Sequence, residues 1–307
     1  MTTESITSIT DGQRKQYFRF GEDALERALT EAGLDKEGIQ KLIGNGGQFQ
    51  ADMVASIKRL SVSNQFADEE KESTHGYLSG YKPDPSLDEN LADLETELAR
   101  LRQIPELASA DYDRDYAERI RTGEITLPVG NERWTLIPKW ELLSKTYGVA
   151  VERPLALISQ DRDGNFHNYR EGKLGASYLR QGARSVEMWK QLAKDQKGDI
   201  LIVPIQAGIV HRGRSVRRAR EVFRAHEFGL GAFAVGMFIL THPERLKHLD
   251  DLWIDCAGDE YSPHADGDFP RAPLFHFDDG QVRFGAYWVS DAHSYYGSAS
   301  GSVVVSQ

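Results

Sequence analysis

The stretch PLFHFDDGQVRFGAYW, residues 273–288, decides the fold class of this chain. Residues 273–277 and 281–288 are rich in aromatic and branched apolar side chains, which favour β-strands. The polar tripeptide Asp278-Asp279-Gly280 joins them. The stretch therefore predicts two connected strands and, with them, an antiparallel sheet in the second half of the chain.

The sequence around these strands mixes both kinds of element. Residues 200–203, Ile-Leu-Ile-Val, predict a buried strand from their β-branched content, and residues 231–240 are apolar on every side and so central. Further strands are expected at residues 155–159, 166–170 and 253–256, the first two as a hairpin turning at Gly164. Helices are expected at residues 174–194, 215–228 and 241–249. The small residues of 295–302 suggest a flexible tail.

The first third of the chain is charge-rich and helical in pattern. Amphipathic helices are predicted over residues 22–33, 35–43 and 48–60, which makes residues 1–61 a helical unit, expected to be an antiparallel bundle. Residues 62–86 are polar and contain glycine and proline, as a linker does. Leucines spaced three and four apart then predict a helix over residues 87–101. The fold class is α+β, with residues 87–307 as one mixed domain.

Composition limits the classes of protein to consider. The 307 residues are 40% hydrophobic, enough for a real core, and the net charge of -10 argues against a surface built for nucleic acid. No apolar run is long enough to span a bilayer, so no membrane partner is expected, and the first residues lack a secretory signal pattern. The single cysteine excludes an internal disulfide. These features favour a soluble cytoplasmic protein.

Residues 250–268 form an acidic segment, with seven carboxylates and no lysine or arginine. Crowded carboxylates repel one another unless a cation, a proton or hydrogen-bond donors relieve them. Asp255, Asp259 and Asp268 are the candidate ligands for a divalent cation, and Glu260 is a candidate proton-transfer group. The spacing does not match an EF-hand, and a solvated loop between strands explains the segment equally well.

Residues 211–224 contain six arginines. On a helix beginning after Ser215, Arg217, Arg220 and Arg224 share one face, which suits a small anionic or phosphorylated ligand. The alternative is that these arginines neutralise the acidic segment within the same molecule. Both hold if the two segments line opposite walls of one cleft.

Two resemblances bear on the second half. Gly198-Asp199-Ile200-Leu201, His211 and Asp255-Cys256-Ala257-Gly258 faintly resemble a circularly permuted NlpC/P60-type cysteine hydrolase. That resemblance implies Cys256 as nucleophile and His211 as base, although acidic neighbours raise a thiol pKa and a buried, inert cysteine is the alternative. Residues 198–307 also resemble an uncharacterised bacterial protein family, which implies a bacterial origin and no particular activity.

The sequence thus favours binding of a small anionic ligand by the C-terminal domain, with a divalent cation as a possible cofactor. A non-enzymatic interaction protein with a protein or nucleic-acid partner is the first alternative, and a cysteine hydrolase is the second. The reaction, the substrate and the oligomeric state stay open.

Overall fold

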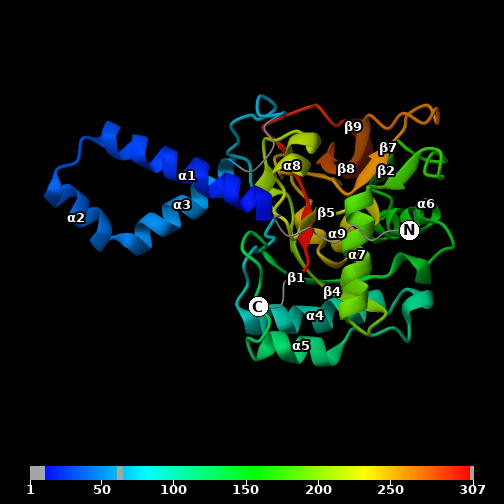
Figure 1. Cartoon of the computed structure of the whole chain (residues 1–307). Helices are drawn as coiled ribbons and strands as arrows, with labels where there is room; N and C mark the ends of the chain where they lie inside the picture. The colour runs from blue at the N-terminus through cyan, green and yellow to red at the C-terminus, as the bar shows by residue number, and fades with distance from the viewer. Residues whose placement is uncertain (1–10, 61–64, 305–307) are drawn as a thin grey trace. The chain divides into compact units, whose positions relative to one another are not determined.

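The computed structural model describes residues 11–60 and 65–304 (Figure 1). The chain divides into two compact units, Met1–Val62 and Ser63–Gln307, and each is described by itself. Helices make up the first unit, and helices with mixed sheets make up the second, so the predicted α+β class is confirmed. Within the described residues, no helix combines the length and apolar character needed to cross a membrane.

Over residues 11–60, the first unit consists of α1 (Asp11–Ala32), α2 (Lys36–Gly44) and α3 (Gly46–Leu60). Gly33 follows α1 with a φ of 60°, and Asp35 begins α2 by accepting a hydrogen bond from the Gly38 amide at 2.8 Å. The helices predicted here are therefore present. Every side chain of this unit whose burial is described is exposed or half-buried. The antiparallel bundle expected from the sequence thus has no buried centre among the side chains whose burial is described.

In residues 65–304, the first sheet has the strand order β1-β4-β11-β5 and is antiparallel throughout. Its strands are β1 (Arg133–Pro138), β4 (Ile200–Gln206), β5 (Glu227–Gly229) and β11 (Ser300–Ser302). Every residue of β4 is buried, as its β-branched sequence predicts. The tail expected to be flexible instead contributes β11, because its small residues fit between the neighbouring backbones at the centre of the sheet.

The second sheet, over the same residues, has the order β10-β6-β8-β7-β3, with β9 beside β8 and β2 beside β9. Its strands are β2 (Phe166–Asn168), β3 (Leu179–Gln181), β6 (Trp253–Asp255), β7 (Asp259–Tyr261), β8 (Arg271–Asp278), β9 (Gln281–Trp288) and β10 (Tyr296–Ser298). The predicted β8–β9 hairpin is confirmed, and it turns at Asp279 and Gly280, whose φ angles are 49° and 75°. The β2–β9 and β6–β10 pairs are parallel.

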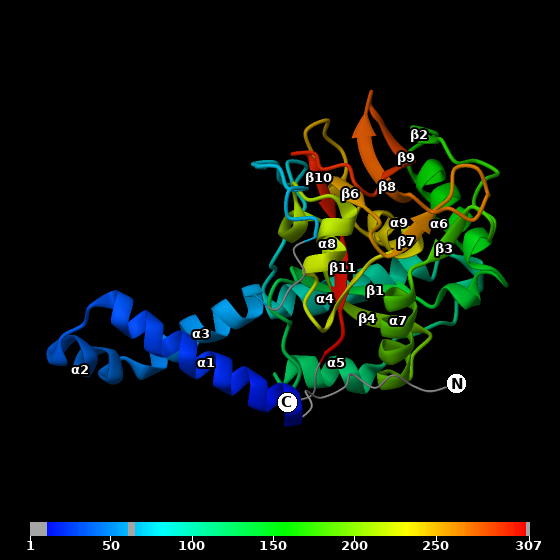
Figure 2. The same cartoon turned by 45° about the horizontal axis from the view of Figure 1, so that its top comes forward.

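The helices of the second unit surround and separate the sheets (Figures 1 and 2). They are α4 (Leu87–Leu101), α5 (Arg114–Arg121), α6 (Tyr147–Asp161), α7 (Ala183–Asp195), α8 (Val216–Val222) and α9 (Ala232–Thr241), with the short turns η1 (Pro105–Leu107), η2 (Trp140–Leu142), η3 (Ile209–His211) and η4 (Pro243–Arg245). The helix α9 is buried along residues 232–240 and contacts both α6 and β1. A side chain at Gly236 would meet Pro154 of α6 and approach Phe275 of β8, so glycine lets these layers close on one another.

The helix α4 closes the first sheet through polar contacts as well as its leucine stripe. Ser86 and Glu89 form a capping box at its start. Asn90 exchanges two hydrogen bonds of 2.8 Å with the backbone of Trp134 in β1. Glu97 accepts hydrogen bonds from the Thr135 hydroxyl and the Leu136 amide, both at 2.7 Å. The predicted helix over residues 87–101 is confirmed.

The segment expected to be a linker, residues 62–86, belongs largely to the second unit. The Lys71 amide bonds the Gly213 carbonyl at 2.7 Å, and the Leu78 amide bonds the Asp251 carboxylate at 2.7 Å. The ring of Tyr81 is buried in the core. The polar composition therefore predicted a linker, whereas residues 65–86 pack against the rest of the second unit. Residues 62–64 lie outside the described residues.

Several local predictions are wrong. Residues 155–159 lie in α6 instead of a strand, so the hairpin with β2 does not form, and β2 pairs with β9. One helix was expected over residues 174–194, but β3 precedes α7 there. One helix was expected over residues 215–228, but β5 follows α8 there. Only η4 forms where a helix to residue 249 was expected. The apolar run of residues 155–159 fits either element, and β3 and β5 form because they pair with β7 and β11, which are distant along the chain.

Candidate functional site

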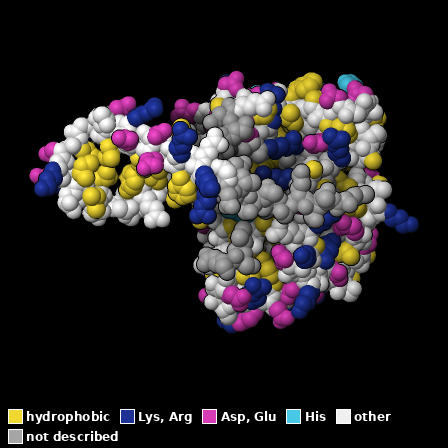
Figure 3. Space-filling view, in the orientation of Figure 1, with side chains coloured by type: hydrophobic (Ala, Val, Ile, Leu, Met, Phe, Trp, Pro, Cys, Tyr) yellow, Lys and Arg dark blue, Asp and Glu magenta, His cyan; other side chains and the backbone are white. Residues whose placement is uncertain are grey.

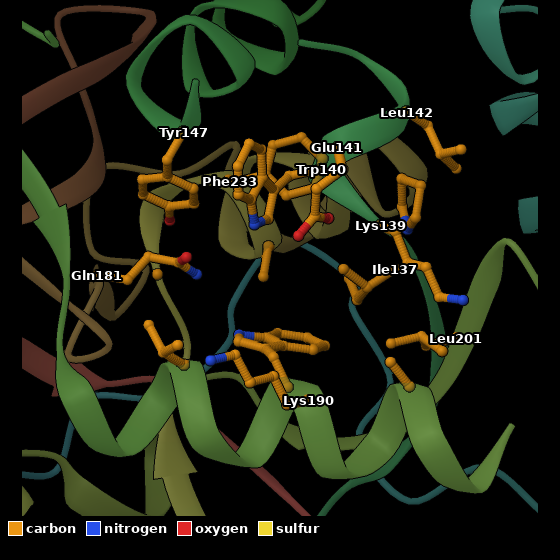
Figure 4. A pocket seen from close by; sticks show the side chains of 16 residues that line it. Ile137, Lys139, Trp140, Glu141, Leu142, Tyr147, Gln181, Lys190, Leu201 and Phe233 are labelled. Atoms are coloured by element: carbon orange, nitrogen blue, oxygen red, sulfur yellow. The ribbon is translucent and has the colours of Figure 1, made fainter. Parts of the chain in front are cut away.

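A cavity of about 360 Å³ lies between the end of β1, η2, α7 and the start of α9 (Figure 4). Aromatic side chains form much of its wall: Trp140 from η2, Trp189 from α7 and Phe233 from α9. The Trp140 ring meets the Tyr147 ring edge-on, with centroids 5.8 Å apart. The cavity therefore offers mainly apolar and aromatic surface.

The local sequence explains how these side chains reach the cavity. On α7, Val186, Trp189, Lys190 and Ala193 follow the spacing i, i+3, i+4, i+7, so they share the face that lines the cavity. The turn η2 follows β1 after one residue, so Lys139, Trp140 and Glu141 enter from a single tight bend.

Five polar side chains line the same space: Lys139, Glu141, Tyr147, Gln181 and Lys190. Figure 4 shows Tyr147 and Gln181 near one another at one end, with Lys139 toward the other. Among the described residues, Lys139, Lys190 and Glu141 have no ion-pair partner within 4.0 Å. The cavity thus combines an aromatic body with charged groups that the rest of the fold leaves uncompensated.

The buried carboxyl of Asp259 lies directly behind Tyr147. The Tyr147 hydroxyl is 2.9 and 2.8 Å from its two carboxyl oxygens, and the Ala232 amide at the start of α9 donates to it at 2.7 Å. Burial raises the pKa of Asp259 to about 7, against the lowering effect of these donors. A side chain at Gly231 would collide with both Asp259 and the Tyr147 hydroxyl, so glycine keeps this arrangement open.

Asp255 is the second buried carboxyl of the acidic segment, and it differs from Asp259 in its partners. It is 3% exposed, and its Oδ2 has no hydrogen-bond partner among the described residues. Burial raises its pKa to about 7, Arg220 opposes this, and Asp291 adds to it. The hydroxyl of Ser298, at the paired position of β10, is likewise buried without a partner in the described chain. The acidic segment is therefore largely inside the protein, where the sequence also allowed a solvated loop.

The three arginines predicted as an anion clamp have separate partners. Arg217 donates to the Glu69 carboxylate at 2.7 Å, and Arg224 donates to the Val129 carbonyl. Arg220 donates to the carbonyls of Ala257 and Asp259 at 2.9 and 2.7 Å. The arginine helix and the acidic segment do meet, at Arg220, but through backbone carbonyls. These contacts leave no common arginine face for an anion.

The predicted nucleophile and base have other contacts. Cys256 is fully buried, and burial, then the charges of Asp259 and Asp255, raise its pKa. His211 Nε2 lies 2.7 Å from Glu227, and Nδ1 lies 3.1 Å from an Arg214 nitrogen, so both ring nitrogens are engaged. Glu260 points to the opposite face of β7 from Asp259 and pairs with Arg180 at 2.6 Å. The geometry gives no support to a Cys256–His211 pair.

The carboxylates proposed as metal ligands do not come together. Across the part of the chain that the structure describes, no group of three His, Cys, Asp or Glu side chains converges as a metal site requires. Asp268 is exposed, whereas Asp255 and Asp259 are buried. This geometry argues against the metal site expected from the sequence.

His211 belongs instead to a buried polar network that joins β4, β5 and β11. The Ser300 hydroxyl donates to Glu227 at 2.6 Å, and the Gln206 amide donates to that hydroxyl at 2.8 Å. Burial acts to raise the pKa of Glu227, but hydrogen bonds from His211 and Ser300 lower it to about 2. The network satisfies the polar groups of the sheet centre, which is a structural role for His211.

Comparisons with known proteins add no assignment. No protein-family model, curated protein or solved structure matches this chain. The site therefore has to be judged from its own geometry.

Sequence reasoning identified Asp259 but missed the residues that surround the cavity. Tyr147, Trp140 and Gln181 come from separate elements and form no motif along the chain. Trp189 lies in the helix predicted over residues 174–194, but nothing in the sequence marked it as a cavity residue. The sequence carried only a general signal for this face: Lys190 lies beside Trp189 on α7, but it is exposed, and lysines commonly flank a packed apolar face.

Proposed function

We propose that the second unit binds a small ligand combining an apolar ring system with an anionic group, in the cavity beside Tyr147. The observation that carries the proposal is a cavity walled by Trp140, Trp189 and Phe233 and lined by two lysines, which have no carboxylate partner in the described part of the chain. A volume of about 360 Å³ lies at the lower end of the range for small-molecule sites. This keeps the small anionic ligand expected from the sequence but moves its site from α8 to α7.

Each kind of side chain has a role in the proposed complex. The aromatic walls supply apolar contact area and stacking for a ring. Lys139 and Lys190 each favour a carboxylate or phosphate of the ligand, because neither has a carboxylate partner within 4.0 Å among the described residues. Glu141 and the Gln181 side-chain oxygen accept hydrogen bonds, which favours a ligand that also carries an N–H group. An indole or comparable ring with an acidic substituent meets all three requirements.

The arginine-rich helix does not carry this proposal. Arg217 is paired with Glu69, Arg218 with Glu70, and Arg214 also approaches Glu70. Their charges are thus largely compensated within the second unit. A nucleic-acid partner has no comparable support, since such binding depends on basic side chains that are available to phosphates.

Calorimetric titration of the full chain with indole-3-acetate and with the neutral indole-3-acetamide tests the proposal. We expect the carboxylate to bind more tightly. The variant Lys190→Met should weaken carboxylate binding by about two- to fivefold, a typical effect of one exposed charge pair, while leaving amide binding unchanged. Lys194→Met is the matched control, because Lys194 lies on the same helix outside the cavity lining.

A second variant separates the cavity from the charges. Ala193→Phe places a ring in the lined space from α7 and should abolish binding of both probes, with folding checked by thermal unfolding. The proposal is contradicted if neither probe binds to the wild-type chain. It is also contradicted if Lys190→Met and Lys194→Met weaken carboxylate binding equally.

A further inference from the structure

The first unit presents an uncovered apolar face along α1. At 100° per residue, Tyr17, Phe18, Leu25 and Leu29 fall with Gly21, Ala24, Ala28 and Ala32 within an arc of about 140°. Over residues 17–32 this arc contains no charged residue, and Asp11 and Arg14 fall in it nearer the start of the helix. We call the set within residues 17–32 the α1 stripe. Its four large side chains are 44, 60, 38 and 41% exposed in chain order. Figure 3 shows hydrophobic side chains gathered over the helices of this unit.

No described side chain of the unit is buried, and α3 adds exposed apolar residues such as Phe49 and Ile57. Helices in proteins gain most of their stability by packing an apolar face against another surface. Contiguous apolar patches of this kind mark interaction surfaces. We therefore expect another surface to pack against the α1 stripe. The charges of α1 indicate what that surface is.

After its first residue, Asp11, the charges of α1 divide along its length. Residues 14–20 contain three bases and no acid, namely Arg14, Lys15 and Arg19. Residues 21–32 contain four acids and one base, namely Glu22, Asp23, Glu26, Glu31 and Arg27. Among the described residues, none of these side chains forms an ion pair. The two halves of one helix are thus complementary to each other, yet they cannot meet within a single straight helix.

A second copy of α1 running antiparallel solves this problem. Its acidic half lies against the basic half of the first helix, and the reverse holds at the other end, as a two-fold axis requires. A parallel pair would set base against base and acid against acid. Gly21 lies at the boundary of the two halves, where antiparallel helices centred on that boundary cross, and a Cβ-free position there permits close approach.

We propose that the α1 stripe is a self-association surface, on which two copies of this chain pair α1 with α1 in antiparallel orientation. The apolar stripe supplies the stability of the pair, and the divided charges supply its direction. The proposal is independent of the ligand cavity, which is lined by residues of the second unit alone.

Sedimentation equilibrium of the full chain tests the proposal. The wild-type chain should be a dimer. Leu25→Glu with Leu29→Glu should give a monomer at the same concentration, because two carboxylates would be desolvated in the paired face. Thr30→Glu, which adds the same kind of charge on the opposite side of α1, is the matched control and should stay dimeric.

Charge reversal tests the orientation. Reversing the basic half (Arg14→Glu, Lys15→Glu, Arg19→Glu) or the acidic half (Glu22→Lys, Asp23→Lys, Glu26→Lys) should each raise the dissociation constant by about tenfold or more. Combining both sets restores complementarity and should restore the wild-type value. A monomeric wild-type chain overturns the proposal. This holds whether the α1 stripe is then exposed to solvent or covered by another part of the same chain. Failure of the combined variant to recover overturns the antiparallel pairing.

Discussion

Asp255 is a carboxyl inside the second unit with no donor to its Oδ2 in the described chain, and this makes its ionisation costly. Burial raises its pKa in the folded chain to about 7, whereas an aspartate in an unfolded chain titrates near pH 4. Between these values the folded chain holds a proton that the unfolded chain has released. This group therefore favours folding fully below about pH 4, and its contribution is lost as the pH rises through about 7.

The variant Asp255→Asn removes this titration. We expect the free energy of unfolding of the wild-type chain to fall from pH 4 to pH 7 by up to roughly 4 kcal/mol for this one carboxyl. The variant should lose that part of the slope and be more stable than wild type at pH 8. Urea unfolding at several pH values measures both effects.

Asp268→Asn is the control, because that side chain is exposed. It should leave the pH profile unchanged. Asp259 shifts in the same direction, so some slope persists in Asp255→Asn. An unchanged slope in that variant would show that Asp255 is solvated in solution.

The sequence marked Asp255 and Asp259 as unusual because acids crowd together there, but it left open how that crowding is relieved. A crowded carboxylate can be relieved by metal, solvent or a proton, and burial decides among them. Burial here follows from β6 and β7 lying inside a sheet whose partners, β10 and β3, are distant along the chain. Tyr147 was not predictable for the same reason, since a residue 112 positions from Asp259 supplies its hydroxyl donor.

Among the elements, the start of α9 sets the geometry behind the cavity. The Ala232 amide and the Tyr147 hydroxyl both reach Asp259 only because Gly231 has no side chain. The change Gly231→Ala should therefore displace Asp259 or Tyr147 and cost about 1–3 kcal/mol, as overpacking does. Thermal unfolding measures the loss, and titration with indole-3-acetate shows whether the cavity is altered.

Gly285→Ala is a suitable comparison, because a Cβ there meets only the Tyr169 ring at 3.9 Å. It lies within β9 and should be tolerated much better, with probe binding retained. Equal destabilisation by the two variants would mean that the close approach at Gly231 is not what limits the site.

Elements were predictable from sequence where a long periodic pattern or a complete local signal is present. The helix α4 has its leucine spacing and its capping box, and the β8–β9 hairpin has two apolar runs with a short connection. Residues 155–159 lack such a signal. Their apolar run suits a strand or a helix, and contact between α6 and α9 favours the helix, which no local pattern contains.

At the scale of the whole molecule, the two units differ in how their backbones are protected. Residues 65–304 include buried strands such as β4, whereas no described side chain of residues 11–60 is buried. The change from charged helices to mixed elements was visible in the sequence. The packing of residues 65–86 was not, because the backbone amides of Lys71 and Leu78 bond Gly213 and Asp251, which lie 142 and 173 residues away along the chain.

Hydrogen exchange of the full chain converts this contrast into a measurement. Amides of β4 and α9 should exchange only through global opening, because their side chains are buried on all sides. Amides of α2 should exchange far faster at every protein concentration, since its helix has no buried residue.

The exchange rate of the α1 amides should depend on protein concentration. It should be fast in dilute protein and slower as self-association covers the α1 stripe, because binding to a surface stabilises it by mass action. Leu25→Glu with Leu29→Glu should remove that dependence without altering exchange in β4. Protection of α1 that is strong and independent of concentration would instead mean that the stripe is covered within one chain, and the division of stability between the two units would then be wrong.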